Sequence, residues 1–128
     1  MRVVVDASAI MALMLGEPGA EIVIAVVRRS LMSAVIVSEC CARGVERQAS
    51  VEQVLEIVRG YDVEVVPFDL DDALAAGRLR ASTRSIGASL GDRACLALGQ
   101  RNHLPVLTGD RRLAAIDPAL GIDVRLIR

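Results

Sequence analysis

The sequence predicts an α/β fold: a three-layer α/β/α sandwich with a mostly parallel central sheet. Short apolar segments typical of strands alternate along the chain with segments of helical periodicity, as in parallel sheets covered by helices. Hydrophobic residues make up 53% of the 128 residues but aromatic residues only 2%. The core must therefore consist of Val, Leu, Ile and Ala, which suit a sheet buried on both faces. No long polar stretch interrupts the pattern, and residues 1–128 are expected to form one domain.

The first half of the chain alternates between strand and helix. The spacing of Ile10, Leu13 and Met14 indicates a helix that begins after Asp6 and stops at the Gly16-Glu17-Pro18-Gly19 break. Further helices are expected near Ala20–Arg29, Val37–Arg47 and Val51–Arg59, and strands at Val3–Val5, Leu31–Ala34 and Val63–Val66, the last stopped by Pro67.

The second half of the chain begins with a helix that Asp69 or Asp71 can cap. Its residues Leu70, Leu74 and Ala81 share one face. Ser89-Leu90-Gly91-Asp92 has the spacing of a capping box, which predicts a helix to Arg101 after a turn at Ser85–Ser89. The last elements expected are a strand at Pro105–Leu107, the turn Thr108-Gly109-Asp110, a short helix at Arg111–Ile116 and a strand near Val124–Ile127.

Several locations and sites are disfavoured by the sequence. The longest apolar runs, Ala9–Leu15 and Ile22–Val27, are much shorter than the ~18 residues of a membrane span. The first strand begins at Val3, which leaves no room for an export signal. We therefore expect a soluble, cytoplasmic protein with no membrane contact.

The cysteines favour neither a disulfide framework nor a zinc site. They are Cys40, Cys41 and Cys95, and they show no C-x-x-C spacing.

The absence of Lys excludes several enzymes that share this fold class, since all 15 basic residues are Arg. Receiver domains and aspartate-nucleophile phosphatases also carry an acid after the first strand, but both depend on a Lys near the phosphoryl group. The phosphatases also need a second Asp where this chain has Ser8. A phosphate-binding loop needs Gly-Lys, and a dinucleotide site needs G-x-G-x-x-G after the first strand; the sequence has neither.

Acidic residues occur where the predicted fold gathers its ligands. Asp6 and Asp110 follow strands, and ligands of parallel sheets bind at the carboxyl ends of the strands. Glu39 and Asp92 lie near the starts of predicted helices. Each acid alone has a structural interpretation, as a cap for Asp6, Asp92 and Asp110 and as an exposed helical acid for Glu39. If they converge, the carboxylates must take up protons or bind a cation, and oxygen ligands favour Mg²⁺ or Mn²⁺.

Four segments resemble, in order, the acidic motifs of VapC-type PIN-domain toxins, the ribonucleases of toxin–antitoxin pairs. They are Val-Val-Asp6-Ala-Ser8-Ala, Val-Ser38-Glu39, Leu-Gly-Asp92-Arg-Ala-Cys-Leu-Ala-Leu and Leu-Thr108-Gly-Asp110-Arg. The resemblance covers essentially the whole chain and implies that the four acids bind metal, with the Ser8 and Thr108 hydroxyls beside them. Two positions depart from the family: Ser38 stands where many relatives carry Asn, and Cys40-Cys41 where aliphatic residues are common.

The resemblance implies cleavage of RNA by water activated on Mg²⁺ or Mn²⁺, with Glu39 or Asp92 as an additional proton acceptor. It also implies a homodimer and a VapB-type antitoxin that sends an Arg into the carboxylate pocket. The amphipathic segments Ala20–Arg29 and Val51–Arg59 could contact partners or pack in the core.

The alternative function is a catalytically silent PIN-like module that binds RNA or protein. A basic rim for RNA, or only a solvated helix face, is formed by Arg84, Arg93, Arg111 and Arg112.

Overall fold

Parallel strands form the centre of the computed structural model, which describes residues 2–128. The five-stranded sheet has the order β3-β2-β1-β4-β5. Every strand pairing among these residues is parallel, so the sheet is parallel throughout where a mostly parallel one was expected. The strands are β1 (Val4–Val5), β2 (Leu31–Ser33), β3 (Glu64–Val66), β4 (Val106–Thr108) and β5 (Val124–Leu126).

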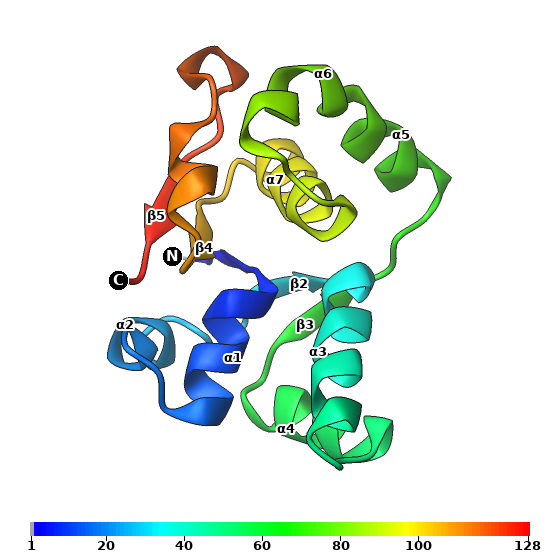
Figure 1. Cartoon of the computed structure of the whole chain (residues 1–128), viewed down its shortest axis with the longest axis vertical. Helices are drawn as coiled ribbons and strands as arrows, with labels where there is room; N and C mark the ends of the chain where they lie inside the picture. The colour runs from blue at the N-terminus through cyan, green and yellow to red at the C-terminus, as the bar shows by residue number, and fades with distance from the viewer. Residues whose placement is uncertain (1) are drawn as a thin grey trace.

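Helices cover both faces of the sheet, which confirms the predicted three-layer sandwich (Figure 1). One layer contains α1 (Ala7–Leu15), α2 (Ala20–Ile24), α3 (Ala34–Glu46) and α4 (Val51–Gly60), and the other contains α5 (Leu70–Arg78), α6 (Arg80–Thr83) and α7 (Leu90–Asn102). Short 3-10 helices complete the structure: η1 (Arg84–Ile86), η2 (Arg111–Ala115) and η3 (Pro118–Leu120). None of the helices in residues 2–128 is both long enough and apolar enough to cross a membrane.

The core is aliphatic, as the near absence of aromatic residues requires. Strand β1 is inaccessible on both faces of the sheet, because a parallel sheet between two helical layers has no solvent-facing side. Ile10 and Ile36 pack beneath it on the α1 and α3 side, and Leu96 and Leu113 form part of a second cluster on the α7 side. These clusters fix α3 and α7 to opposite layers of the sheet, and the two helices also contact each other.

The expected helix boundaries differ from the structure at α2 and α3. Helix α2 ends at Ile24 instead of near Arg29. Helix α3 begins at Ala34, one turn before the expected start, because the Ser33 hydroxyl caps it by accepting a hydrogen bond from the Val35 amide. This earlier start still places Glu39 on α3. The predicted capping box at Ser89 is present in α7, and of the two caps considered for α5 the structure uses Asp69.

The prediction that Leu70, Leu74 and Ala81 share one face of a single helix is wrong. The helix breaks at Leu79, and Ala81 lies in the separate helix α6. Leu70 and Leu74 are 73% and 48% exposed, whereas Ala76 and Leu79 are the buried residues of this region. The core therefore takes a different side of α5 from the one that periodicity indicates.

The strand order reverses direction between β1 and β4, and this point positions the candidate site. The chain moves from β1 outward to β2 and β3, then crosses to β4 on the other side of β1. Val5 pairs with Leu107, so the next residues, Asp6 and Thr108, lie side by side at the carboxyl ends of β1 and β4. Crevices at such reversals are the usual ligand sites of parallel sheets.

Candidate functional site

A pocket of about 420 Å³ lies at the carboxyl ends of β1 and β4. All four acids singled out in the sequence line it: Asp6, Glu39, Asp92 and Asp110. They come from different elements, since Asp6 follows β1, Glu39 lies on α3, Asp92 on α7, and Asp110 precedes η2. The fold therefore brings together side chains that are far apart in the sequence, at the edge where the strand ends predicted them.

Asp6 is held rigidly at the start of α1. Its Oδ1 atom accepts hydrogen bonds from the Ala9 amide, at 2.9 Å, and from the Ser8 hydroxyl, at 2.7 Å. The residue is only 5% exposed. This burial raises the pKa of the Asp6 carboxyl, and hydrogen bonds from the neighbouring hydroxyls partly oppose the shift. A buried acid next to other acids is a group whose charged form requires a cation nearby.

The hydroxyls of Ser8 and Thr108 join the ends of the two central strands. Ser8 Oγ accepts a hydrogen bond from the Gly109 amide at 2.7 Å and lies 3.4 Å from Thr108 Oγ1. Thr108 Oγ1 in turn accepts from the Asp110 amide at 2.9 Å. Since Ser8 also donates to Asp6, these two hydroxyls link the backbone at Asp110 to the carboxylate of Asp6.

Glu39 lies directly against the first turn of α7. A methyl group at Gly91 would approach the Cδ atom of Glu39 to 2.7 Å and would overlap the Oε1 atom. Only glycine at this position leaves room for the carboxyl group. Burial raises the pKa of the Glu39 carboxyl, and the negative charge of Asp92 raises it further. The N-terminus of α7, against which the Glu39 carboxyl lies, favours the negatively charged form of this group.

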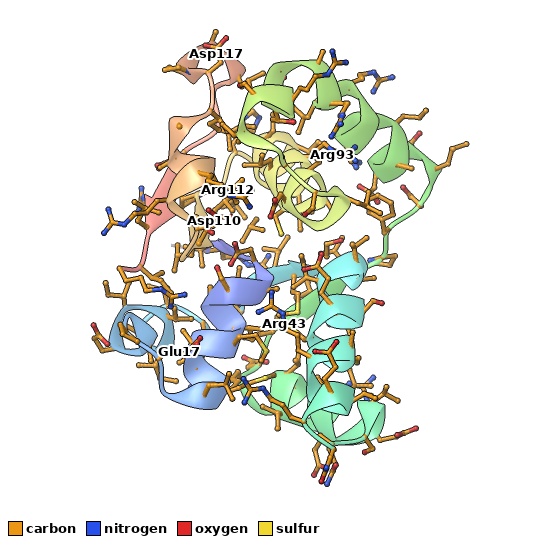
Figure 2. The ribbon with its side chains drawn as sticks, in the orientation of Figure 1. Glu17, Arg43, Arg93, Asp110, Arg112 and Asp117 are labelled. Carbon is orange, nitrogen blue, oxygen red and sulfur yellow. The ribbon has the colours of Figure 1, made fainter. Side chains whose placement is uncertain are left out.

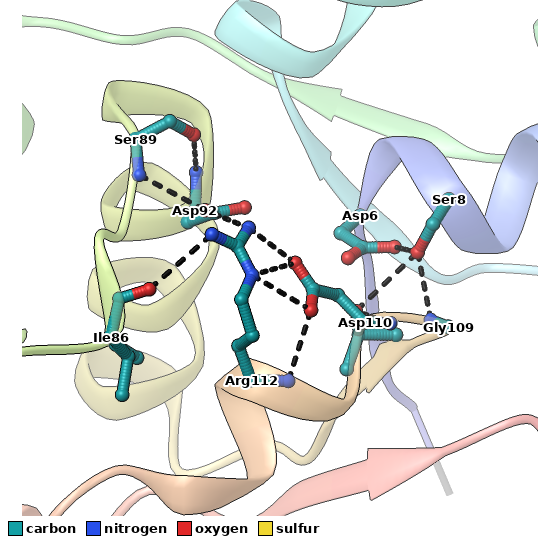
Figure 3. Close-up of polar contacts among 9 residues, drawn as sticks. Asp6, Ser8, Ile86, Ser89, Asp92, Gly109, Asp110 and Arg112 are labelled. Atoms are coloured by element: carbon teal, nitrogen blue, oxygen red, sulfur yellow. Dashed lines mark hydrogen bonds and ion pairs between the residues drawn. The ribbon is translucent and has the colours of Figure 1, made fainter.

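Arg112 occupies the opposite side of the pocket and binds Asp110 (Figure 3). Its Nη2 atom lies 2.6 Å from Asp110 Oδ2, and its Nε atom lies 3.2 Å from both carboxylate oxygens. The same guanidinium lies 3.9 Å from Asp92 Oδ2 and donates to the Ile86 carbonyl at 3.3 Å. Hydrogen bonds from Arg112 hold the pKa of the Asp110 carboxyl below its ordinary value.

The structural roles suggested for three of the acids are present alongside the pocket. Asp6 caps α1, Asp110 caps η2, and Asp92 completes the capping box of α7 by accepting from the Ser89 amide at 3.0 Å. Within residues 2–128, the side chain of Glu39 makes no hydrogen bond or ion pair. Capping therefore accounts for three of the acids, but it does not account for Glu39 or for the convergence of all four.

The donor set suits a hard divalent cation. It contains carboxylate and hydroxyl oxygens and no His, and the pocket already attracts a cation in the form of the Arg112 guanidinium. In the part of the chain that the structure describes, no three His, Cys, Asp or Glu side chains come close enough to bind one ion. Mg²⁺ commonly uses one or two carboxylates and keeps several waters. The chemistry of the residues fits such an ion. One ion would contact fewer protein side chains directly than the four acids suggest.

The basic residues predicted around the site take different positions. Arg112 lines the pocket, whereas Arg84 and Arg111 are exposed and do not line it. Arg93 is half-buried and donates to the Ala76 carbonyl at 3.1 Å, which ties α7 to α5. Arg43, which sequence reasoning missed, also lines the pocket; Figure 2 shows it on the α3 side, across from Arg112. Its position one turn after Glu39 on the same helix was the available signal.

A family model for the PIN domain matches residues 3–118. No curated protein sequence matches the chain. Solved structures with the same fold include a toxin–antitoxin complex from Klebsiella pneumoniae, at 16% identity and a TM-score of 0.74, with 98% of each chain covered. DNA-bound VapBC from Salmonella typhimurium has 21% identity and a TM-score of 0.71, covering 100% of this chain and 99% of that one. VapBC-5 from Mycobacterium tuberculosis has 26% identity and a TM-score of 0.64, covering 99% and 98%.

Proposed function

The chain belongs to the PIN-domain family, and from this premise we propose that it is a metal-dependent endoribonuclease, the toxin of a VapBC-like toxin–antitoxin pair. The observation that carries the proposal is the convergence of Asp6, Glu39, Asp92 and Asp110 on one pocket at the strand-order reversal. The similarity to VapBC complexes over nearly the full chain supports the same function.

The four carboxylates would hold one or two Mg²⁺ or Mn²⁺ ions, partly through bound water. Such an ion would lower the pKa of a bound water and neutralise charge on the attacked phosphate. Asp6 and Asp110 lie at the ends of neighbouring strands and are best held to orient such a site. Asp92 has one oxygen committed to the Ser89 amide, whereas Glu39 has no hydrogen-bond partner within residues 2–128. Glu39 is therefore better placed than Asp92 to accept the proton of the attacking water at its carboxylate oxygens.

The substrate we propose is RNA, in line with the family resemblance. Arg43 and Arg112 lie on opposite sides of the pocket and could contact phosphates on either side of the cleaved bond. Arg84 and Arg111 are exposed on η1 and η2, which contact each other. They would bind more distant phosphates, where Arg side chains position nucleic acid without reading its sequence. Arg93 has a backbone partner on α5 and is assigned a structural role instead.

Metal should both stabilise the folded chain and switch on cleavage. Since only the folded pocket assembles the acids, Mn²⁺ at a hundred-fold excess over its Kd would stabilise the protein by about 2.7 kcal/mol. We expect a rise in Tm with millimolar Mn²⁺ or Mg²⁺, cleavage of a single-stranded RNA under the same conditions, and reversal of both by EDTA. Differential scanning fluorimetry and gel analysis of end-labelled RNA measure the two effects.

The same assay separates the nuclease from a catalytically silent module. Such a module would bind RNA in a gel-shift assay and leave it intact at every metal concentration. Stable binding without cleavage by a metal-saturated, folded protein would contradict the proposed activity. A Tm that does not respond to millimolar divalent ions would contradict the proposed metal site.

A homodimer and an antitoxin are proposed as partners of this chain. The two amphipathic segments expose apolar side chains: Ile22 and Ile24 of α2 are 46% and 52% exposed, and Val51 and Ile57 of α4 are each 45% exposed. Exposed apolar residues that gather on a surface are typical of interaction sites. Their exposure shows that packing in the core of this chain does not use them fully.

Co-expression with a candidate antitoxin, encoded by a short reading frame next to the gene for this chain, should give a stable complex in which cleavage is inhibited. Arg112 already pairs with Asp110, so an Arg from an antitoxin would have to displace it or bind the remaining acids. We expect an Arg→Ala change in the part of the antitoxin that reaches the pocket to restore cleavage, and an Ile24→Asp change on α2 to weaken the complex. Light scattering gives the oligomeric state. A chain that stays monomeric and forms no complex would contradict the partner proposal and leave the nuclease proposal intact.

A further inference from the structure

The Arg112 side chain binds the carboxylate pocket as a two-pronged ligand. Both oxygens of Asp110 are engaged: Oδ2 accepts from Nη2 and Nε, and Oδ1 accepts from Nε and from the backbone amide of Arg112 at 2.9 Å. Pairs of this bidentate kind are the strongest contacts between a guanidinium and a carboxylate. In this arrangement, Asp110 presents no oxygen that is free of a hydrogen bond.

The guanidinium also offsets part of the negative charge of the pocket. It lies 3.9 Å from Asp92 Oδ2 and so stands between two of the converging acids (Figure 3). Arg remains charged at any pH that a folded protein experiences. Without a cation here, carboxylates from η2 and α7 would face one another across the pocket with only repulsion between them.

The contact is nevertheless able to open. The Arg112 side chain is 58% exposed, and its remaining partner, the Ile86 carbonyl, is at 3.3 Å. Leaving the pocket therefore requires no rearrangement of the core. The long side chain can rotate into solvent while the backbone amide of Arg112 continues to donate to Asp110 Oδ1, the hydrogen bond by which Asp110 caps η2.

We propose that Arg112 is a built-in competitor of the divalent cation, which holds Asp110 and Asp92 until metal binds and so determines the metal affinity of the site. This inference rests on the proposed function. It predicts that metal and guanidinium exclude each other at Asp110, since the ion needs an oxygen that Arg112 occupies. The wild-type protein would then bind metal more weakly than its acids alone would allow.

The test is calorimetric titration of the purified full chain with Mn²⁺, comparing Arg112→Met, Arg112→Lys and Arg111→Met with wild type. Arg112→Met keeps an unbranched apolar stem but removes the charged guanidinium, and Mn²⁺ should bind about ten-fold more tightly, which corresponds to about 1.4 kcal/mol. Arg112→Lys keeps the charge without the two-pronged contact and should lie between the two. Arg111→Met removes the same charge from the neighbouring exposed residue, which does not line the pocket, and should change the Kd less than two-fold.

Circular dichroism checks that each variant is folded. If Arg112→Met does not fold, Arg112→Lys still tests whether weakening the contact with Asp110 tightens Mn²⁺ binding. A Kd for Arg112→Met equal to or weaker than wild type overturns the inference, as does an equal gain in Arg111→Met, which would reveal a general charge effect. If wild type binds Mn²⁺ and cleaves RNA while the Arg112 variants bind as wild type does, only this inference fails. If no form binds Mn²⁺ and wild type cleaves no RNA, the proposed function fails with it.

Discussion

Asp6→Asn should lower the rate of RNA cleavage by at least about a hundred-fold while the protein keeps its fold. The amide oxygen of Asn can accept the hydrogen bonds from the Ala9 amide and the Ser8 hydroxyl that Asp6 Oδ1 accepts now, and Asn caps helices as well as Asp does. The charge that faces the pocket is lost. Changes to groups that only support metal ligands already cost about 10- to 100-fold, and a direct ligand should cost more.

The same substitution should leave the metal-free protein at least as stable as wild type at neutral pH. Burial raises the pKa of Asp6 above its ordinary value of 3.8, so the folded state holds this proton more tightly than the unfolded state does. That contribution to stability is complete below pH 3.8 and is lost as the pH rises through the raised pKa. Asn never ionises, so its advantage should grow over this window. Melting curves of both proteins in EDTA, from about pH 3.5 to about pH 7, measure how the difference in Tm between Asp6→Asn and wild type changes with pH.

Asp69→Asn provides the matched control, because Asp69 caps α5 in the same way that Asp6 caps α1 but does not line the pocket. It should cleave RNA at the wild-type rate. Cleavage by Asp6→Asn at a rate similar to that of Asp69→Asn, with Mn²⁺ present and both proteins folded, would remove Asp6 from the proposed metal site.

The fold class and the place of the pocket could be predicted because they depend on local patterns. Apolar strands followed by acids indicate both a parallel sheet and the edge where those acids meet. The resemblance to VapC-type PIN toxins is confirmed by the PIN-domain match and by the similarity to VapBC structures. Cys40, a departure from the family pattern, fits this fold because it is 1% exposed and packs in the core beside Glu39 as a small apolar residue.

Features that depend on contacts between distant elements could not be predicted. Periodicity identified an apolar stripe on α5, but whether that stripe packs in the core depends on how α5 crosses α7, which no local pattern records. Arg93 and Arg112 both follow a predicted acid within two residues, yet one donates to a backbone carbonyl on α5 and the other binds a carboxylate. The role of Gly91 is equally invisible in the sequence, because its constraint comes from Glu39 on another helix.

Gly91→Ala should weaken Mn²⁺ binding and lower RNA cleavage by about a hundred-fold without unfolding the protein. The added methyl group would overlap Glu39 Oε1 and approach Cδ to 2.7 Å. The atoms in its way are the end of a flexible side chain, so the fold accommodates the change by moving the carboxyl group away from the first turn of α7. A displacement of about 1 Å at a reacting centre can cost about a hundred-fold in rate.

Gly77→Ala is the matched control, since Gly77 also lies in a helix but a methyl group there would meet no atom within 4 Å. It should retain full activity and gain up to about 1 kcal/mol from the better helix propensity of Ala. The double variant Gly91→Ala with Glu39→Asp tests the geometry directly, because the side chain shortened by one methylene withdraws the carboxyl group from the new methyl. We expect the double variant to recover Mn²⁺ affinity, measured by calorimetry, relative to Gly91→Ala alone. Wild-type affinity and cleavage in Gly91→Ala would show that the position of Glu39 against α7 does not matter for the site.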